Sequence, residues 1–290
     1  MAIGQVVRLH GGFYYVVSHD SGEIQECIRR GRLSKERLLV GDYVVICEVA
    51  PGKCTIEELL PRRTKLIRPP VANTDQSIIV FSLRDPKPDF KLLDRFLLIS
   101  AAALIEPVIC FNKSDLAPVS TYPKQFEAYN GAGYRIVVTS AKTGEGIDGL
   151  RAALAGRITV IAGPSGVGKT SLLNAIQPGL KLKTGEISKK TGRGRHITRL
   201  VELIPLYGGG FVVDTPGFTR LNLPDIETAT LSRYFPEINR FSGRCRFNNC
   251  LHNTEPDCAV RKAVGDGRIP SFRYRHYQSL LAEISERVRR

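Results

Sequence analysis

The amino-terminal part of the chain alternates short apolar runs with turn sequences. The runs are rich in β-branched and aromatic residues, and turn sequences such as Gly11-Gly12 separate them. Evenly spaced short strands of this kind are typical of a small β-barrel. The predicted strands are residues 5–9, 13–17, 24–28 and 42–48. We expect residues 1–67 to form an oligonucleotide-binding barrel, or OB-fold. A small all-β domain without a role in nucleic-acid binding is the alternative.

From about residue 68 the pattern changes to strands that alternate with helices. Strands are predicted at residues 76–82, 107–111, 136–139, 157–162 and 209–213, and helices at 90–103 and 171–176. Strands separated by helices indicate a parallel sheet that is covered on both faces. We therefore predict an α/β domain over residues 68–222. A small, mostly helical domain is expected over residues 223–290, with helices at 226–234 and from 271 onward.

Charge and composition indicate which kind of partner the protein binds and where in the cell it is expected. Lys and Arg exceed Asp and Glu by 42 to 28, and residues 67–222 carry +8 of the +14 net charge. Such an excess indicates a polyanionic partner such as nucleic acid, although charge alone does not separate RNA from DNA or an anionic membrane. No 18-residue apolar stretch exists, and the first residues lack the pattern of a signal peptide. We expect a cytoplasmic protein without a membrane segment.

Short motifs of a guanine-nucleotide site follow the predicted strands, but their order differs from that of a Ras-type GTPase. Asn-Lys-Ser-Asp at residues 112–115 comes first, then Ser-Ala-Lys at 140–142, then the phosphate loop from Gly163 to Thr170, and finally Asp-Thr-Pro-Gly at 214–217. This order is a circular permutation. Because such sites are built from loops at the carboxyl ends of parallel strands, the chain can begin at another strand without disturbing the site.

The phosphate loop carries the Gly-x4-Gly-Lys-Thr pattern between an apolar strand and a helix. Its backbone N–H groups are expected to bind phosphate oxygens, while Lys169 reaches the outer phosphates and the Thr170 hydroxyl binds magnesium. The expected phosphate-binding residues are Gly163, Pro164, Ser165, Gly166, Val167, Gly168, Lys169, Thr170 and Ser171.

The first two motifs are expected to determine which nucleotide base the site binds. The Asp115 carboxylate can accept two hydrogen bonds from guanine, and adenine offers no such pair. Lys113 is expected along the base, Asn112 is expected to brace the loops, and the Ala141 N–H is expected at the guanine carbonyl oxygen. The remaining residues expected in this part of the site are Ser140 and Lys142.

The segment around Asp214 is expected to sense the terminal phosphate. Asp214 would hold magnesium through water, and the Gly217 N–H would contact the phosphate. Ras-type enzymes place a water-orienting Gln after this glycine, whereas this chain has Phe218. Water must therefore be positioned by another group.

A basic stretch at residues 181–199 precedes that segment, in the place of a first switch loop. It supplies His196 as the candidate for handling water and Thr198 as a magnesium ligand. The alternatives are that this stretch is a solvated loop and that His196 is a bystander. The expected catalytic residues are Lys169, His196 and Gly217, and the expected magnesium ligands are Thr170, Thr198 and Asp214.

Three cysteines and a histidine crowd together near the carboxyl end. Cys245, Cys250, His252 and Cys258 offer three thiolates and one imidazole, which is the ligand set of one closed tetrahedral zinc site. A structural role is expected, because no coordination position remains for chemistry. A coincidence of free thiols is the alternative.

With these residues in place, the chain resembles the bacterial RsgA (YjeQ/YloQ) family of ribosome-small-subunit-dependent GTPases. The resemblance covers nearly the whole chain and includes Val40-Gly41-Asp42, Leu93-Asp94-Arg95, the permuted motifs, Gly-Arg-Gly-Arg-His at 192–196 and the cysteine cluster. It implies an OB-fold barrel, a circularly permuted GTPase domain and a zinc domain.

The resemblance also implies a function in late maturation of the small ribosomal subunit. Its partners would be GTP and GDP, the subunit and its rRNA, and the subunit would stimulate a weak GTPase activity. The switch histidine of the family corresponds to His196, but Ile197 and Arg199 flank a single Thr198 where the family has a run of threonines. We expect a monomer. A non-catalytic, GTP-responsive RNA-binding adaptor is the competing function, and a GTPase that loads metal onto a client is a third.

Overall fold

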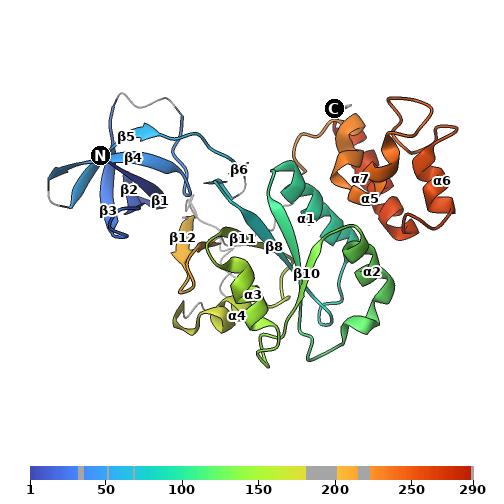
Figure 1. The fold of residues 1–290 in the computed structure, drawn as a ribbon, viewed down its shortest axis with the longest axis horizontal. Helices are drawn as coiled ribbons and strands as arrows, with labels where there is room; N and C mark the ends of the chain where they lie inside the picture. Colours follow the sequence, from blue (N-terminus) through green and yellow to red (C-terminus); the bar gives the residue numbers. More distant parts are fainter. Residues whose placement is uncertain (32–35, 51, 68, 181–200, 215–222, 289–290) are drawn as a thin grey trace, which may run out of the picture.

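The computed structural model describes the whole chain except residues 32–35, 51, 68, 181–200, 215–222 and 289–290. Figure 1 shows three parts side by side: an amino-terminal barrel, a central α/β domain and a carboxy-terminal helical domain. The barrel and the helical domain lie on opposite sides of the central domain. Within the described residues, none of the helices is long and apolar enough to cross a membrane.

The barrel closes on itself through its first strand. Its sheet order is β1-β2-β3-β5-β4, and β1 also pairs with β4. The pairing of β3 with β5 is parallel, and the other pairings in the barrel are antiparallel. This order and closure confirm the predicted OB-like barrel. The strands are β1 (Ala2–His10), β2 (Phe13–Ser18), β3 (Ile24–Arg29), β4 (Tyr43–Ala50) and β5 (Lys53–Leu59).

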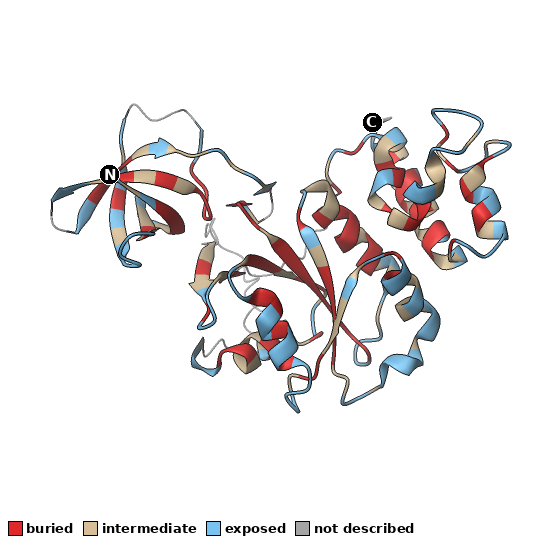
Figure 2. Cartoon of the chain, viewed as in Figure 1, coloured by how far each residue is buried: buried red, intermediate tan, exposed pale blue. Residues whose placement is uncertain are grey.

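The central domain is built on a mainly parallel sheet. Its order is β10-β9-β8-β11-β13-β12, and only the pairing of β12 with β13 is antiparallel among these described strands. All residues of β8 are buried, as expected for a strand covered on both faces and as Figure 2 shows for the centre of the sheet. The strands are β8 (Gln76–Ser82), β9 (Glu106–Asn112), β10 (Arg135–Val138), β11 (Ile158–Ala162), β12 (Glu202–Pro205) and β13 (Phe211–Asp214).

Helices cover the two faces of this sheet. One apolar cluster includes Leu150 and Leu172 from α3 and α4, and another includes Phe96 and Tyr129 from α1 and α2. The helices are α1 (Phe90–Ala102), α2 (Pro123–Gly131), α3 (Ile147–Leu154) and α4 (Lys169–Ile176). Short elements complete this part: β6 (Lys65–Leu66), β7 (Val71–Ala72), η1 (Val119–Thr121) and η2 (Pro178–Leu180).

The carboxy-terminal domain packs its helices around its own apolar core, to which Leu98 and Ile99 of α1 also contribute. The helix predicted at residues 226–234 is present as a 3-10 helix over Thr228–Tyr234, which begins two residues later than predicted. The elements are η3 (Thr228–Tyr234), α5 (Pro236–Ser242), α6 (Ala259–Gly265) and α7 (Ser271–Val288).

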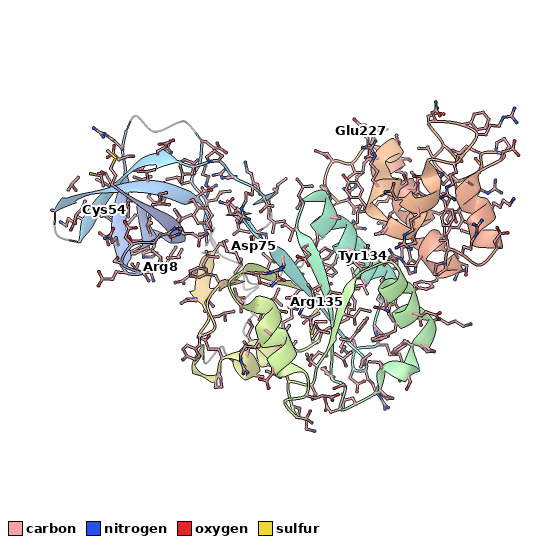
Figure 3. All side chains as sticks on the ribbon, in the orientation of Figure 1. Arg8, Cys54, Asp75, Tyr134, Arg135 and Glu227 are labelled. Atoms are coloured by element: carbon pink, nitrogen blue, oxygen red, sulfur yellow. The ribbon has the colours of Figure 1, made fainter. Side chains whose placement is uncertain are left out.

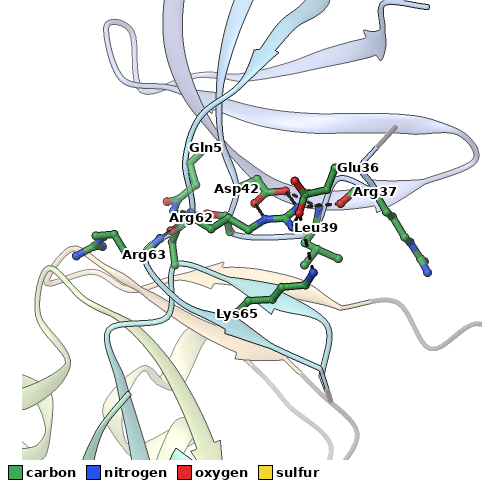
Figure 4. A network of polar contacts seen from close by, with 10 residues as sticks. Gln5, Glu36, Arg37, Leu39, Asp42, Arg62, Arg63 and Lys65 are labelled. Carbon is green, nitrogen blue, oxygen red and sulfur yellow. Dashed lines mark hydrogen bonds and ion pairs between the residues drawn. The ribbon is translucent and has the colours of Figure 1, made fainter. Parts of the chain in front are cut away.

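A polar network, shown in Figure 4, holds the segment that leaves the barrel against the barrel itself. The Asp42 carboxylate, which is fully buried, accepts hydrogen bonds from the Leu39 N–H (2.7 Å) and from Nε and Nη2 of Arg62 (2.6 and 2.8 Å). Next to it, Gly41 has a φ of +89°, and a Cβ there would lie 2.1 Å from the carbonyl oxygen of Ala72. Only glycine allows this approach of the barrel to the following segment.

The same network continues to the strand that precedes the phosphate loop. Arg63 Nη2 donates to Asp75 Oδ1 (2.9 Å), and Asp75 Oδ2 accepts from the N–H of Ile158, the first residue of β11 (2.8 Å). Figure 3 shows Asp75 between the barrel and the central sheet. The barrel is therefore tied to the strand that leads into the phosphate loop.

Candidate nucleotide site and metal centre

The phosphate loop lies between β11 and α4, at the carboxyl edge of the parallel sheet. Gly163 has a φ of +137°, and a Cβ at this position would lie 2.1 Å from the carbonyl oxygen of Val80 in β8. Glycine is required because the loop passes so close to the neighbouring strand. Helix α4 begins at Lys169, so its unpaired N–H groups and positive dipole end lie at the loop. Such helix ends bind phosphate groups.

Asn112 joins the loops of the predicted nucleotide site. It ends β9 and is buried. Its Nδ2 donates to the carbonyl oxygen of Val167 in the phosphate loop (2.8 Å), and its Oδ1 accepts from the Ala141 N–H (3.2 Å). Gly168 allows this approach, because a Cβ there would lie 2.4 Å from Asn112 Nδ2. The base-reading motif, the 140–142 motif and the phosphate loop thus meet around one buried amide.

The rest of the base-reading motif lies at the same edge. Lys113 Nζ donates to the carbonyl oxygens of Gly166 (2.7 Å) and Asp85, which places the lysine stem beside the phosphate loop. Asp115 is exposed, and its Oδ1 accepts from the hydroxyl of the buried Ser140 (2.7 Å). The other predicted residues of these loops are exposed or half-buried: Lys142, Pro164, Ser165, Thr170 and Ser171.

The Lys169 amine folds back onto its own loop. Its Nζ donates to the carbonyl oxygens of Gly163 (2.8 Å) and Pro164 (2.6 Å). Burial lowers the pKa of Lys169 from 10.5 to about 8, because the charged form is partly removed from water. Phosphate oxygens at this position would favour the charged amine and raise that pKa again.

Two residues support the base-reading motif without having been predicted. The Thr139 hydroxyl donates to Asn112 Oδ1 (3.3 Å), and Glu145 Oε2 accepts from the Ser114 hydroxyl (2.7 Å). Thr139 directly precedes the motif that begins at Ser140, and this position in the sequence could have identified it as a supporting residue. Glu145 offers no comparable signal, because its contact spans 31 positions along the chain.

The residues expected to handle magnesium and water are only partly described. Asp214 ends β13, which pairs with β11 in the register Val213 to Val160. Asp214 and the phosphate loop therefore leave adjacent strands at the same edge of the sheet. Thr170 is half-buried in the first turn of α4, whereas four residues of the two switch segments lie outside the described part of the chain: His196, Thr198, Gly217 and Phe218.

The cysteine cluster converges on one point in the carboxy-terminal domain. The ligand atoms of Cys245, Cys250, His252 and Cys258 all lie within 4.8 Å of one another. Cys245 Sγ lies 3.8 Å from Cys258 Sγ, and His252 Nδ1 lies 3.4 and 3.5 Å from these two sulfurs. A tetrahedron with Zn–S arms of about 2.3 Å has edges of about 3.8 Å. The donor set can therefore hold a metal ion with little movement.

Hydrogen bonds hold the loop that carries His252. Tyr274 and Tyr277 of α7 donate to the carbonyl oxygens of His252 (2.7 Å) and Leu251 (2.8 Å). Glu255 accepts from the N–H groups of Leu251, Asn253 and Thr254 at 2.8 to 3.1 Å. Burial alone would raise the pKa of Glu255, but these backbone donors lower it. The loop is thus ordered by groups outside the predicted ligand set.

Comparison with known proteins gives full-length similarities. Residues 59–224 match the model of the RsgA GTPase family, and residues 3–56 match that of the RsgA N-terminal domain. The chain is 54% identical to the small ribosomal subunit biogenesis GTPase RsgA of Moorella thermoacetica, over 99% of this chain and 98% of that one. It is 47% identical to the protein of the same name from Caldanaerobacter subterraneus, over 99% and 97%.

Two solved structures are similar in fold. YjeQ from Thermotoga maritima has a TM-score of 0.86 at 39% identity, over 98% of both chains. YloQ, described as a circularly permuted GTPase, has a TM-score of 0.85 at 40% identity, over 99% of this chain and 96% of that one. The predicted permutation and fold class are confirmed.

Proposed function

The chain belongs to the RsgA GTPase family, and on that premise we propose that it binds the small ribosomal subunit and its rRNA. In this proposal the protein assists late maturation of that subunit, and it hydrolyses GTP faster when it is bound to the subunit. That the protein is a GTPase follows from its family. The observation that carries the proposal is the convergence of the three nucleotide loops on Asn112, in a chain whose full-length relatives are named for small-subunit biogenesis. We infer that it acts as a monomer in the cytoplasm.

Guanine selection is assigned to Asp115. Its carboxylate would accept hydrogen bonds from the ring N–H and the exocyclic amine of guanine. Ser140 holds one carboxylate oxygen in place, and Lys113, already directed along the phosphate loop, would lie against the base. The Ala141 N–H would meet the guanine carbonyl oxygen.

Magnesium fits the edge of the sheet at which Thr170 and Asp214 emerge, and Thr198 is proposed as the ligand from the first switch segment. When bound with GTP, this ion would supply positive charge that neutralises the charge developing on the phosphates. Lys169 would add a second cation there. Its current carbonyl partners would be exchanged for phosphate oxygens.

Positioning of water is assigned to His196. Phe218, in the place of the usual water-orienting Gln, can neither orient nor polarise water. The Gly217 N–H would contact the terminal phosphate. The non-catalytic adaptor, which Phe218 left open in the sequence, is not supported, because the chain belongs to a GTPase family.

The metal proposed for the cysteine cluster is zinc, in a structural role. Three thiolates and one imidazole complete a tetrahedral shell and leave no open position. The site would fix the loop between α5 and α6.

Phosphate release with and without purified small subunits tests the function. We expect stimulation in the wild type and little turnover in Lys169→Ala, because its charge meets the phosphates. Lys124→Ala, an exposed change in α2, serves as the matched control and should behave as the wild type. Equal turnover with and without subunits would contradict the proposed stimulation.

A further inference from the structure

Two aromatic side chains lie on either side of Cys245 in the sequence. Phe241 is in α5, and Phe247 follows Cys245 in the loop that carries the cysteine cluster. Phe247 is 40% exposed, and Phe241 is half-buried. The loop holds Phe247 in place, because the Cys250 N–H donates to the Phe247 carbonyl oxygen at 3.3 Å. Both rings are therefore presented to solvent by ordered backbone.

Three exposed arginines lie over these two rings. The guanidinium carbon of Arg268 is 5.0 Å from the centre of the Phe241 ring, and that of Arg244 is 5.8 Å from the same centre. The guanidinium carbon of Arg246 is 5.6 Å from the centre of the Phe247 ring. These distances are within the range of cation–π contacts. We call these two phenylalanines and three arginines the arginine-aromatic surface.

Two carboxylates orient the arginines without neutralising the surface. Asp266 Oδ2 accepts from Arg268 Nη2, and Asp257 Oδ2 accepts from Arg246 Nη1, both at 2.9 Å. A guanidinium carries five N–H donors, so a single contact of this kind leaves donors for another acceptor. Residues 240–268 contain six Lys and Arg against three Asp and Glu. The surface is therefore positive and favours an anionic partner.

The chemistry of the surface favours unpaired nucleotides. Its cations are all arginines, whose planar guanidinium both stacks on rings and pairs with phosphate, as the ammonium of lysine does not. Bases of single-stranded RNA stack on aromatic rings and on guanidinium planes, whereas base faces in a duplex are already stacked on one another. A lipid surface requires several exposed apolar groups. Among the described residues from 223 onward, Phe247 is the one large hydrophobic side chain that is exposed.

We propose that the arginine-aromatic surface binds unpaired nucleotides of RNA. Bases would stack on Phe247 and Phe241, and phosphates would pair with the three arginines. The inference rests on the proposed binding of rRNA, to which it adds a surface and a class of RNA structure. Because every base has a flat face, such stacking depends little on base identity. The surface therefore selects unpaired segments rather than a particular sequence.

Fluorescence anisotropy with the full-length protein and a labelled uridine oligoribonucleotide of about 12 nucleotides tests the stacking. Phe247→Leu should lower the affinity for this single strand about 10-fold, while its affinity for an RNA duplex of equal length stays within about twofold of wild type. Phe247→Tyr keeps the ring and should bind as the wild type. Tyr207→Leu removes an exposed aromatic ring of the central domain and should leave both affinities unchanged.

A salt series tests the phosphate contacts. Arg246→Met should weaken binding of the single strand and reduce the slope of log affinity against log salt by about 0.7, the value for one phosphate contact of a single strand. Arg246→Lys should restore the slope but only part of the affinity, because lysine keeps the charge and loses the stacking plane. Arg135→Met removes an exposed arginine of β10 and should change neither quantity.

Crosslinking with a thiouridine-labelled strand locates the contact. Figure 1 shows the carboxy-terminal domain on the side of the central domain opposite the barrel, so crosslinks to the two domains are distinguishable. We expect crosslinks within residues 241–247. Crosslinks confined to the barrel, together with unchanged affinity in Phe247→Leu, would overturn the inference.

Other outcomes separate this inference from its premise. Equal losses for single strand and duplex in Phe247→Leu would rule out stacking, and so would a loss that occurs only when the variant has also lost its bound metal. Binding of the wild type to anionic vesicles that Phe247→Leu abolishes would assign the surface to a membrane instead. Failure of the wild type to co-sediment with small subunits contradicts the proposed function, whereas co-sedimentation with an unchanged single-strand affinity in Phe247→Leu contradicts the surface alone.

Discussion

The lowered pKa of Lys169 predicts that nucleotide binding takes up a proton in mildly alkaline solution. In the nucleotide-free protein the amine is partly buried and its pKa is about 8. Phosphate oxygens would return that pKa to at least its ordinary value of about 10.4. Because the bound state holds the proton more tightly, affinity must fall as the pH rises through the lower pKa.

The size of the effect follows from these two values. With a pKa of about 8, roughly a quarter of the free protein has a neutral Lys169 at pH 7.5, and roughly three quarters at pH 8.5. The affinity for GDP should therefore fall about threefold over this interval, and binding at pH 8.5 should take up about 0.75 proton. The interval lies above the range near pH 6 in which a terminal phosphate titrates.

Titration calorimetry with GDP, in two buffers of different ionisation enthalpy, measures both quantities. Lys169→Arg, which keeps its charge throughout, should bind less tightly but without the proton uptake. Lys124→Met removes an exposed lysine of α2, outside the site, and should retain the uptake. Binding at pH 8.5 without net proton uptake, or an equal uptake in Lys169→Arg, would refute the assignment of this proton to Lys169.

Three further predictions concern the base, the metal and the water. Asp115→Asn should shift preference from guanine to xanthine nucleotides, because an amide can donate to the extra ring carbonyl; unchanged selectivity in a competition titration would contradict the assignment. Cys258→Ser should lose the bound metal and unfold the carboxy-terminal domain first, as checked by elemental analysis and limited proteolysis, whereas Cys47→Ser should keep one metal per chain. His196→Ala should bind GTP normally but lose about 100-fold or more of the subunit-stimulated turnover; stimulated turnover within about twofold of wild type would rule out its role.

Much of the fold could be predicted because its signals are local. The strand predicted at residues 76–82 matches β8, whose continuous apolar run is typical of a strand buried on both faces. Strand β5 was not predicted, because Lys53, Glu57 and Glu58 interrupt its apolar positions. Helix α2 was missed as well, since its sequence has little apolar periodicity and buries only Tyr129. Closure of the barrel by β1 and β4 has no local signal at all.

The candidate site likewise has parts that could be predicted from local sequence and parts that could not. The phosphate loop, the base motif and the metal ligands are short patterns whose chemistry can be read from consecutive residues. The contacts that support them are distant in sequence: Asn112 reaches Val167 across 55 positions, and Ser114 reaches Glu145 across 31. The pair that joins α1 to α7 is more distant still, because Asp94 and Arg273 are 179 positions apart. Arg273 is buried between two carboxylates and over the rings of Tyr129 and Phe235. A buried arginine of this kind has no pattern in the surrounding sequence that distinguishes it from an exposed one.

Each outer domain has a connection to the predicted nucleotide site. The barrel reaches it through Asp75 and the first residue of β11, the strand that leads into the phosphate loop. The helical domain reaches it through Leu223, at the end of the segment that leaves β13. Because β11 and β13 are neighbours in the sheet, both connections end at the same pair of strands. A partner that contacts the barrel and the helical domain together would therefore contact the two parts of the chain that join β11 and β13. An unpermuted order, in which the Asp214 segment continued into another strand of the sheet, would lack the second of these connections.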